Sequence, residues 1–146
     1  MGKAKTTRKL FSRETSIDAD IAAPPERVWS VLTDAGDFAR WNSTVVSLSG
    51  EIAPEGRLEL VSTLAPKRTF TLRVQEFLPP RRLVWGDALG RRVFTLEKTA
   101  AGTRLSMCEK IGGPLFPLFS RMIPPFDQAF EQFVADLARE STAART

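Results

Sequence analysis

The sequence predicts one α+β domain in which a curved antiparallel sheet of about seven strands wraps around a long C-terminal helix. Three observations favour this fold class. Short stretches with period-two alternation, separated by turn residues, fill residues 43–111. These stretches are apolar on one side only, which is typical of an antiparallel sheet. The C-terminal segment carries apolar residues at helical spacing, so it can cover the apolar side.

The first elements are expected after a basic N-terminal tail, residues 1–12. Apolar and polar residues alternate from Ile17 to Ile21, as in a half-buried strand. The pair of prolines that follows ends this strand, and "PERVWSVLTD" then places its apolar residues at helical spacing, with Pro25 suited to the first turn. The next residues, "AGDFARWN", predict a turn or a second short helix that ends near Asn42.

Six further strands are predicted between Ser43 and Ile111: "STVVSLSGEI", "RLELVSTL", "TFTLRVQEF", "LVWGDA", "RVFTLEK" and "TRLSMCEKI". The turns between them are short, so the strands form an antiparallel meander. Their apolar face comprises Leu58, Leu60, Leu64, Phe70, Leu72, Val74, Leu83, Trp85, Phe94, Leu96, Leu105 and Met107. Another element must cover this face.

A β-bulge is predicted near Gln75 and Glu76. Val74 and Phe77 are both apolar but stand three positions apart, whereas residues on one face of a regular strand are separated by an even number of positions. One extra residue keeps both side chains on the inner face, and it also bends the strand.

The C-terminal helix is expected from about Pro125 to Glu140, because Phe126, Phe130, Phe133 and Leu137 form an apolar stripe. It is preceded by the apolar, proline-rich residues 113–123, and five of the ten phenylalanines fall within Pro114–Val134. Three roles stay open for residues 113–123: a fixed cap on the sheet, a mobile lid, or a contact with a membrane surface or a second copy. No apolar run reaches the length of about 18 residues that a membrane-spanning helix needs.

The stretch "IAAPPERVWSVLTD" followed by "RWN", together with "PPRRLVW", resembles the START-like superfamily, also called SRPBCC or Bet v 1-like, in its polyketide cyclase/dehydrase-related branch. The resemblance implies a helix-grip fold over residues 13–141, with tails at 1–12 and 142–146. It also implies a cavity between sheet and helix that binds or transports a hydrophobic or amphipathic small molecule or lipid. A cofactorless cyclase or dehydratase that uses a buried carboxylate is the alternative.

We expect the cavity to be lined by the inward residues of the central strands and of the helix: Leu60, Leu72, Trp85, Phe94, Met107, Phe126, Phe130 and Phe133. Because each strand reverses direction, the loops "LAPKR" and "ALGRR", the end of the second short helix and the link to the C-terminal helix should meet at one end of the sheet. The cavity mouth is therefore expected at Trp41, Lys67, Arg68, Arg91 and Phe119, with a basic rim that suits an acidic head group.

The chain has no histidine and no tyrosine, so acid–base chemistry would depend on carboxylates. No catalytic residue stands out, but Glu109 and Asp87 share the inward parity and are the candidates. Alternatively, both reach water or pair with Arg91 or Lys110. Cys108 has the outward parity and no base beside it.

We expect no metal site and no cofactor, and the single cysteine indicates a cytoplasmic protein. The net charge is +4, but the basic residues come in separated pairs, which argues against nucleic acid as a partner. Monomer and homodimer both stay open.

Overall fold

The computed structural model describes residues 2–143, which form one eight-stranded antiparallel sheet and a long helix packed against it. The strands are β1 (Lys5–Arg8), β2 (Ser12–Ile21), β3 (Val45–Gly50), β4 (Arg57–Ser62), β5 (Phe70–Leu78), β6 (Arg82–Gly86), β7 (Gly90–Thr99) and β8 (Gly102–Gly112). Their order is β1-β2-β8-β7-β6-β5-β4-β3, and every neighbouring pair is antiparallel. The predicted helix-grip architecture is confirmed.

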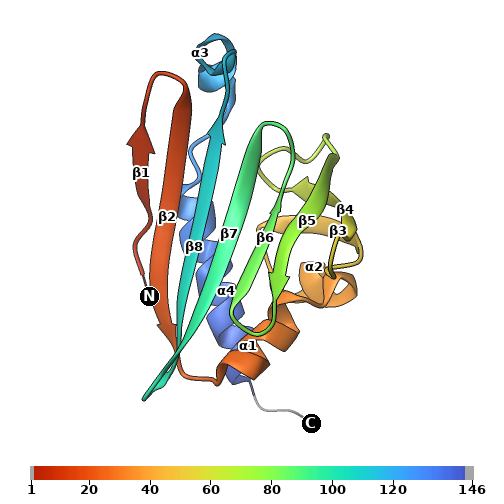
Figure 1. Cartoon of the computed structure of the whole chain (residues 1–146), viewed down its shortest axis with the longest axis vertical. Helices are drawn as coiled ribbons and strands as arrows, with labels where there is room; N and C mark the ends of the chain where they lie inside the picture. The colour runs from red at the N-terminus through yellow and green to blue at the C-terminus, as the bar shows by residue number, and fades with distance from the viewer. Residues whose placement is uncertain (1, 144–146) are drawn as a thin grey trace.

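The helices are α1 (Pro25–Leu32), η1 (Ala35–Asp37), α2 (Phe38–Trp41), α3 (Phe116–Phe119), η2 (Ser120–Met122) and α4 (Asp127–Thr142). Figure 1 shows α4 behind the sheet, α1 at the lower end of the sheet, α2 beside β3, and α3 projecting beyond the opposite end. Helix α4 begins at Asp127, two residues later than predicted, because Phe126 is its N-cap. The inner face of the helix is buried through Phe130, Phe133 and Leu137, as the apolar stripe predicted.

The eighth strand, β1, comes from the segment that the sequence predicted as a tail. It pairs with β2 from Lys5↔Ser16 to Arg8↔Arg13. Side-chain hydrogen bonds also fasten this region to α4: the Thr6 hydroxyl donates to Asp127 Oδ1 at 2.5 Å, and the Ala4 N–H donates to Glu131 Oε2 at 3.0 Å. The alternation in β1 is too short and too polar to be distinguished from a solvated tail by pattern alone.

The predicted bulge in β5 is confirmed. Val74 pairs with Trp85, and Glu76 pairs with Val84, so Gln75 is the extra residue. Val74 and Phe77 consequently both face the core. The bulge increases the local twist and helps the sheet to curve around α4.

Candidate functional site

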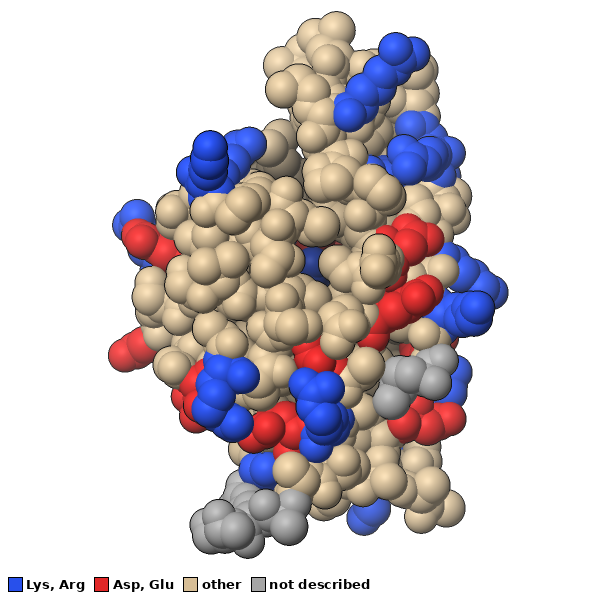
Figure 2. Space-filling view, turned by 180° about the vertical axis from the view of Figure 1, so that it is seen from behind, with Lys and Arg blue, Asp and Glu red and all other residues tan. Residues whose placement is uncertain are grey.

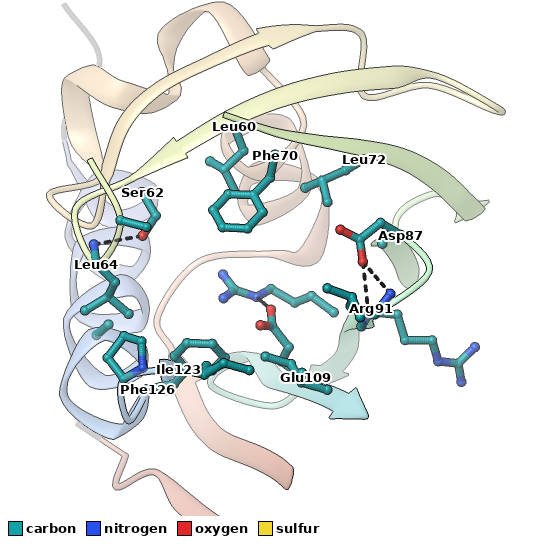
Figure 3. Close-up of a pocket in the computed structure, with 18 of the residues that line it drawn as sticks. Leu60, Ser62, Leu64, Phe70, Leu72, Asp87, Arg91, Glu109, Ile123 and Phe126 are labelled. Atoms are coloured by element: carbon teal, nitrogen blue, oxygen red, sulfur yellow. Dashed lines mark hydrogen bonds and ion pairs between the residues drawn. The ribbon is translucent and has the colours of Figure 1, made fainter. Parts of the chain in front are cut away.

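The inner face of the sheet and α4 enclose a cavity of about 450 Å³. Its apolar wall includes Leu60, Phe70, Leu72, Trp85, Phe126, Phe130 and Phe133. Figure 3 shows Leu60, Phe70 and Leu72 on one side of the space, with Phe126 and Ile123 across from them. The side chains of β4 and β5 lie across the space from those near the start of α4 and do not fill it.

Six of the eight residues that we expected around the cavity lie in its wall: Leu60, Leu72, Trp85, Phe126, Phe130 and Phe133. The other two, Phe94 and Met107, are fully buried but are not part of the wall. They face each other on β7 and β8 and belong to the hydrophobic core. The Phe94 ring, for example, lies 5.8 Å from that of Phe133 between centroids. Inward parity therefore does not distinguish residues of the core from residues that line the cavity.

The open side of the cavity lies between the β4–β5 loop (63–69), the β6–β7 loop (87–89) and the link between β8 and α4 (113–126). Arg68, Arg91 and Phe119, which we expected at the mouth, are among the residues that line the cavity. Lys67 is exposed in the same loop but does not line the cavity. Figure 2 shows a hollow on this face of the molecule, with basic atoms visible in its depth.

Trp41 does not lie at the mouth, contrary to our expectation. Only 4% of its surface is exposed, and its ring packs 4.6 Å from that of Phe38 and 6.2 Å from that of Phe133. The short helix α2 turns this indole inward against α4, so it belongs to the core. Strand parity predicted which end of the sheet the residue occupies, but not which way its helix faces.

The link between β8 and α4 divides into an inner and an outer part. Phe116 is buried, and Phe119, Met122 and Ile123 contribute to the cavity wall. Leu115 and Leu118 point away from the cavity and are largely exposed. The link thus closes part of the cavity while presenting apolar side chains to the outside.

One ion pair, Arg92–Glu109, lies inside the cavity wall. The Arg92 Nε atom donates a hydrogen bond to Glu109 Oε1 at 2.7 Å, and the two side chains are only 18% and 17% exposed. The guanidinium also lies over the Phe130 ring at 4.8 Å and over the Phe133 ring at 5.5 Å. These contacts hold Arg92 in one orientation, which makes it a fixed cation in a largely apolar space.

We did not expect Arg92 inside the cavity, although its position in the strand pattern indicates an inward side chain. It shares parity with Phe94 and Leu96, which places all three on the inner face of β7. Arg13 likewise shares parity with the inward-facing residues Ile17 and Ala19 of β2, and it is also buried. Its guanidinium donates to the carbonyls of Ile123 at 3.1 Å and Pro124 at 2.8 Å, and so holds the link in place.

The two candidate carboxylates have different roles in the structure. Glu109 lines the cavity, but its partner is Arg92 rather than Arg91 or Lys110. Asp87 stands at the open side, where its Oδ1 accepts hydrogen bonds from the N–H groups of Leu89 at 2.9 Å and Gly90 at 3.0 Å. Asp87 therefore shapes the β6–β7 loop, and Glu109 is the carboxylate with access to the interior.

Cys108 lies on the opposite face, where burial and then a hydrogen bond to Glu14 raise the pKa of its thiol to about 12. A thiol with so high a pKa is a poor nucleophile at neutral pH. Among residues 2–143, no group of three or more acidic or cysteine side chains could hold a metal ion. Within the same part of the chain, no helix is both long and apolar enough to cross a membrane.

Solved structures share this fold at low sequence identity. CalU16 from Micromonospora echinospora is 18% identical, with a TM-score of 0.70 over 97% of this chain and 87% of its own. A Mesorhizobium loti protein is 21% identical, with a TM-score of 0.70 over 90% of this chain and 100% of its own. A Nitrosomonas europaea protein is 17% identical, with a TM-score of 0.70 over 92% of this chain and 96% of its own.

A comparison with curated proteins finds no match. The model of one protein family, described as polyketide cyclase / dehydrase and lipid transport, matches residues 12–142. The match covers the sheet from β2 onward and all of α4, so it includes every residue of the cavity wall. The chain therefore belongs to the polyketide cyclase / dehydrase and lipid transport family.

Proposed function

We propose that the protein binds a hydrophobic or amphipathic small molecule or lipid in the cavity between the sheet and α4. The observation that carries this proposal is the fixed Arg92–Glu109 pair inside an otherwise largely apolar cavity. A volume of about 450 Å³ suits a small organic molecule or a single acyl chain. An apolar wall with a few oriented polar groups is typical of sites that bind such molecules.

The charged pair favours a ligand with a polar group at its inner end. The hydrogen bond from Arg92 to Glu109 uses Nε, and among the described residues Nη1 and Nη2 donate to no other protein group. They can donate to a carbonyl or carboxylate oxygen of the ligand. Glu109 Oε2 can accept from a hydroxyl group. A carboxylic acid or a hydroxylated carbonyl compound satisfies this arrangement.

Replacing Phe130 with alanine is expected to weaken binding of the apolar fluorophore N-phenyl-1-naphthylamine by about tenfold, because the ring forms part of the cavity wall. Alternatively, the wider cavity shifts the preference toward bulkier probes. Fluorescence titration measures both effects. Phe70→Ala enlarges the same cavity from the half-buried β5 side, so it serves as a second test if Phe130→Ala does not fold.

The matched control is Val46→Ala, which removes an exposed apolar side chain that is not part of the wall. It should leave the titration unchanged. A wild-type protein that shows no saturable binding of any apolar probe would contradict the proposal.

Reversing the charge of the rim, Arg68→Glu with Arg91→Glu, is expected to weaken dodecanoate binding by about threefold to tenfold at low salt. Dodecanol, which has the same chain without the charge, should bind as it does to the wild type. Arg92→Met, in contrast, should weaken both ligands because it removes donors from the interior. Calorimetric titration separates these cases, and equal effects of the rim change on both ligands would contradict a role of the rim in charge recognition.

A second candidate function is a cofactorless cyclase or dehydratase, and the same ion pair is the observation that favours it. Glu109 can accept a proton from a bound carbonyl compound, while Arg92 stabilises the oxyanion that forms. If the protein is such an enzyme, Glu109→Gln should retain probe binding and lose turnover of a poly-β-ketone substrate. Probe binding without turnover by the wild type favours the carrier function.

A further inference from the structure

One end of the molecule presents a group of exposed apolar side chains. Nine large apolar residues are exposed in the described part of the chain, and five of them lie at this end. We call these five the apolar tip: Leu10, Phe11, Leu115, Leu118 and Met122. Leu118 and Met122 are the most exposed of the five, at 80% and 82%.

The apolar tip is formed by two segments that are far apart in the sequence. Leu10 and Phe11 lie in the turn between β1 and β2, whereas the other three residues belong to the α3–η2 region. The Gly113 N–H donates to the Phe11 carbonyl at 3.0 Å, which joins the segments directly. Figure 1 shows the β1–β2 turn and α3 together at the upper end of the molecule, beyond the edge of the remaining sheet.

The two segments that form the apolar tip carry charges of one sign. Residues 8–13 and 111–126 contain no aspartate or glutamate, but they contain the exposed cations Arg8, Lys9 and Arg121. In Figure 2 the upper projection is mostly uncharged, with basic side chains on it and at its side. Exposed apolar residues next to cations match the two layers of a bilayer surface, the acyl boundary and the anionic head groups.

We propose that the apolar tip docks the protein on the surface of a bilayer that contains anionic phospholipids. A second copy of the chain fits this end less well. In a symmetric dimer the same patch meets itself, which would bring the three cations of each copy together without any carboxylate from the tip segments to compensate them. An anionic lipid surface compensates these cations and also accepts the apolar side chains.

The docked orientation has a consequence for the cavity. Met122 belongs to the apolar tip and also lines the cavity, and Phe119 and Ile123 of the same segment lie in the wall. A bilayer in contact with the tip therefore lies next to the segment that closes the cavity. Transfer of a lipid between the two rests on the proposed function, whereas docking itself does not.

The test is co-sedimentation with vesicles of phosphatidylcholine, with and without phosphatidylglycerol. The wild type should sediment with the mixed vesicles at low salt, and binding should fall at high salt or with phosphatidylcholine alone. Leu115→Ser with Leu118→Ser should lower the partition coefficient by about tenfold or more. Both side chains are exposed and neither lines the cavity, so folding and probe binding should be retained.

Matched control variants carry the same changes elsewhere. The variant with Val46→Ser and Leu78→Ser alters two exposed apolar residues outside the tip, and it should sediment as the wild type does.

The cations of the tip are tested separately. The variant with Arg8→Glu and Arg121→Glu should lose the preference for vesicles that contain phosphatidylglycerol. Arg57→Glu with Arg73→Glu, a pair of exposed residues that face each other on β4 and β5, should not.

Equal sedimentation of the tip variants and the controls would overturn the docking proposal. Light scattering gives a second outcome that would overturn the docking proposal. If the wild type is a dimer and the variant with Leu115→Ser and Leu118→Ser is a monomer, the tip is an interface between copies. If the variant with Leu115→Ser and Leu118→Ser loses vesicle binding but still binds N-phenyl-1-naphthylamine as the wild type does, the result supports docking. Vesicle binding by a wild type that binds no apolar probe supports docking and contradicts the proposed cavity function.

Discussion

Trp29→Ala should lower the free energy of unfolding by about 3–5 kcal/mol. Trp29 lies on α1 and is only 8% exposed, and its ring meets the Phe77 ring edge-on with 5.3 Å between centroids. Helix α1 also packs against α4. The indole therefore packs between α1 and strand β5 in the hydrophobic core, and its removal leaves a cavity there.

Urea unfolding followed by far-ultraviolet circular dichroism measures this change. Ser30→Ala is the matched control, because Ser30 is the exposed neighbour on the same helix and its hydroxyl bonds only to the carbonyl of Arg27. The control should differ from the wild type by less than about 0.5 kcal/mol. A loss below about 1 kcal/mol for Trp29→Ala would show that the indole contributes little to the packing of α1.

The fold was predictable because strand alternation, turn residues and the apolar stripe of the last helix agree with one another. The bulge at Gln75 illustrates how much detail this pattern contains, since one break in parity between Val74 and Phe77 was enough to predict it. Strand β1 was not predictable in this way. Its place in the sheet depends on its hydrogen bonds with β2 and on polar contacts with α4. These contacts require no alternation of apolar residues, so the four-residue sequence does not indicate them.

The cavity was only partly predictable, because parity reports which face a residue occupies and not how far that face is from the helix. Phe94 and Trp85 both point inward, yet Trp85 reaches the cavity and Phe94 is covered. Trp85 pairs with Arg92, which also lines the cavity, whereas Phe94 pairs with Met107 in the core. How far the cavity extends along a strand depends on the curvature of the whole sheet, so it is not encoded at any single position.

The buried arginines were missed for a different reason. Arginine was taken as a mark of the outer face or of the rim, because charged residues are seldom buried. Arg92 and Arg13 are exceptions in which the charge is compensated by Glu109 in the first case and by two backbone carbonyls in the second. Burial, with Arg8 as a further cause, lowers the pKa of Arg13 from its usual value. Strand parity taken without regard to residue type would have placed both arginines inside.

A buried carboxylate, Asp136, connects α4 to the segment that leads into β3. It is 1% exposed and accepts four hydrogen bonds. The N–H and hydroxyl of Ser43 donate at 2.8 and 2.7 Å, Gln132 at 3.0 Å and Arg139 at 2.7 Å. Burial alone would raise the pKa of Asp136, but these hydrogen bonds outweigh it and the pKa is lowered.

Asp136→Asn should therefore lower the free energy of unfolding by about 3 kcal/mol at neutral pH, because an amide can accept only part of these hydrogen bonds and adds donors of its own. The contribution of the charged carboxylate is complete above the pKa of the unfolded chain, about 4, and is lost as the pH falls through the lower pKa of the folded protein. The difference in stability between wild type and variant should thus be constant from neutral pH to about pH 5 and should narrow below about pH 4. Urea unfolding at a series of pH values measures it, with the exposed Glu59→Gln as the control that should differ little from the wild type throughout. A difference that stays constant down to pH values where the folded carboxyl is protonated would show that the Asp136 hydrogen bonds do not depend on its charge.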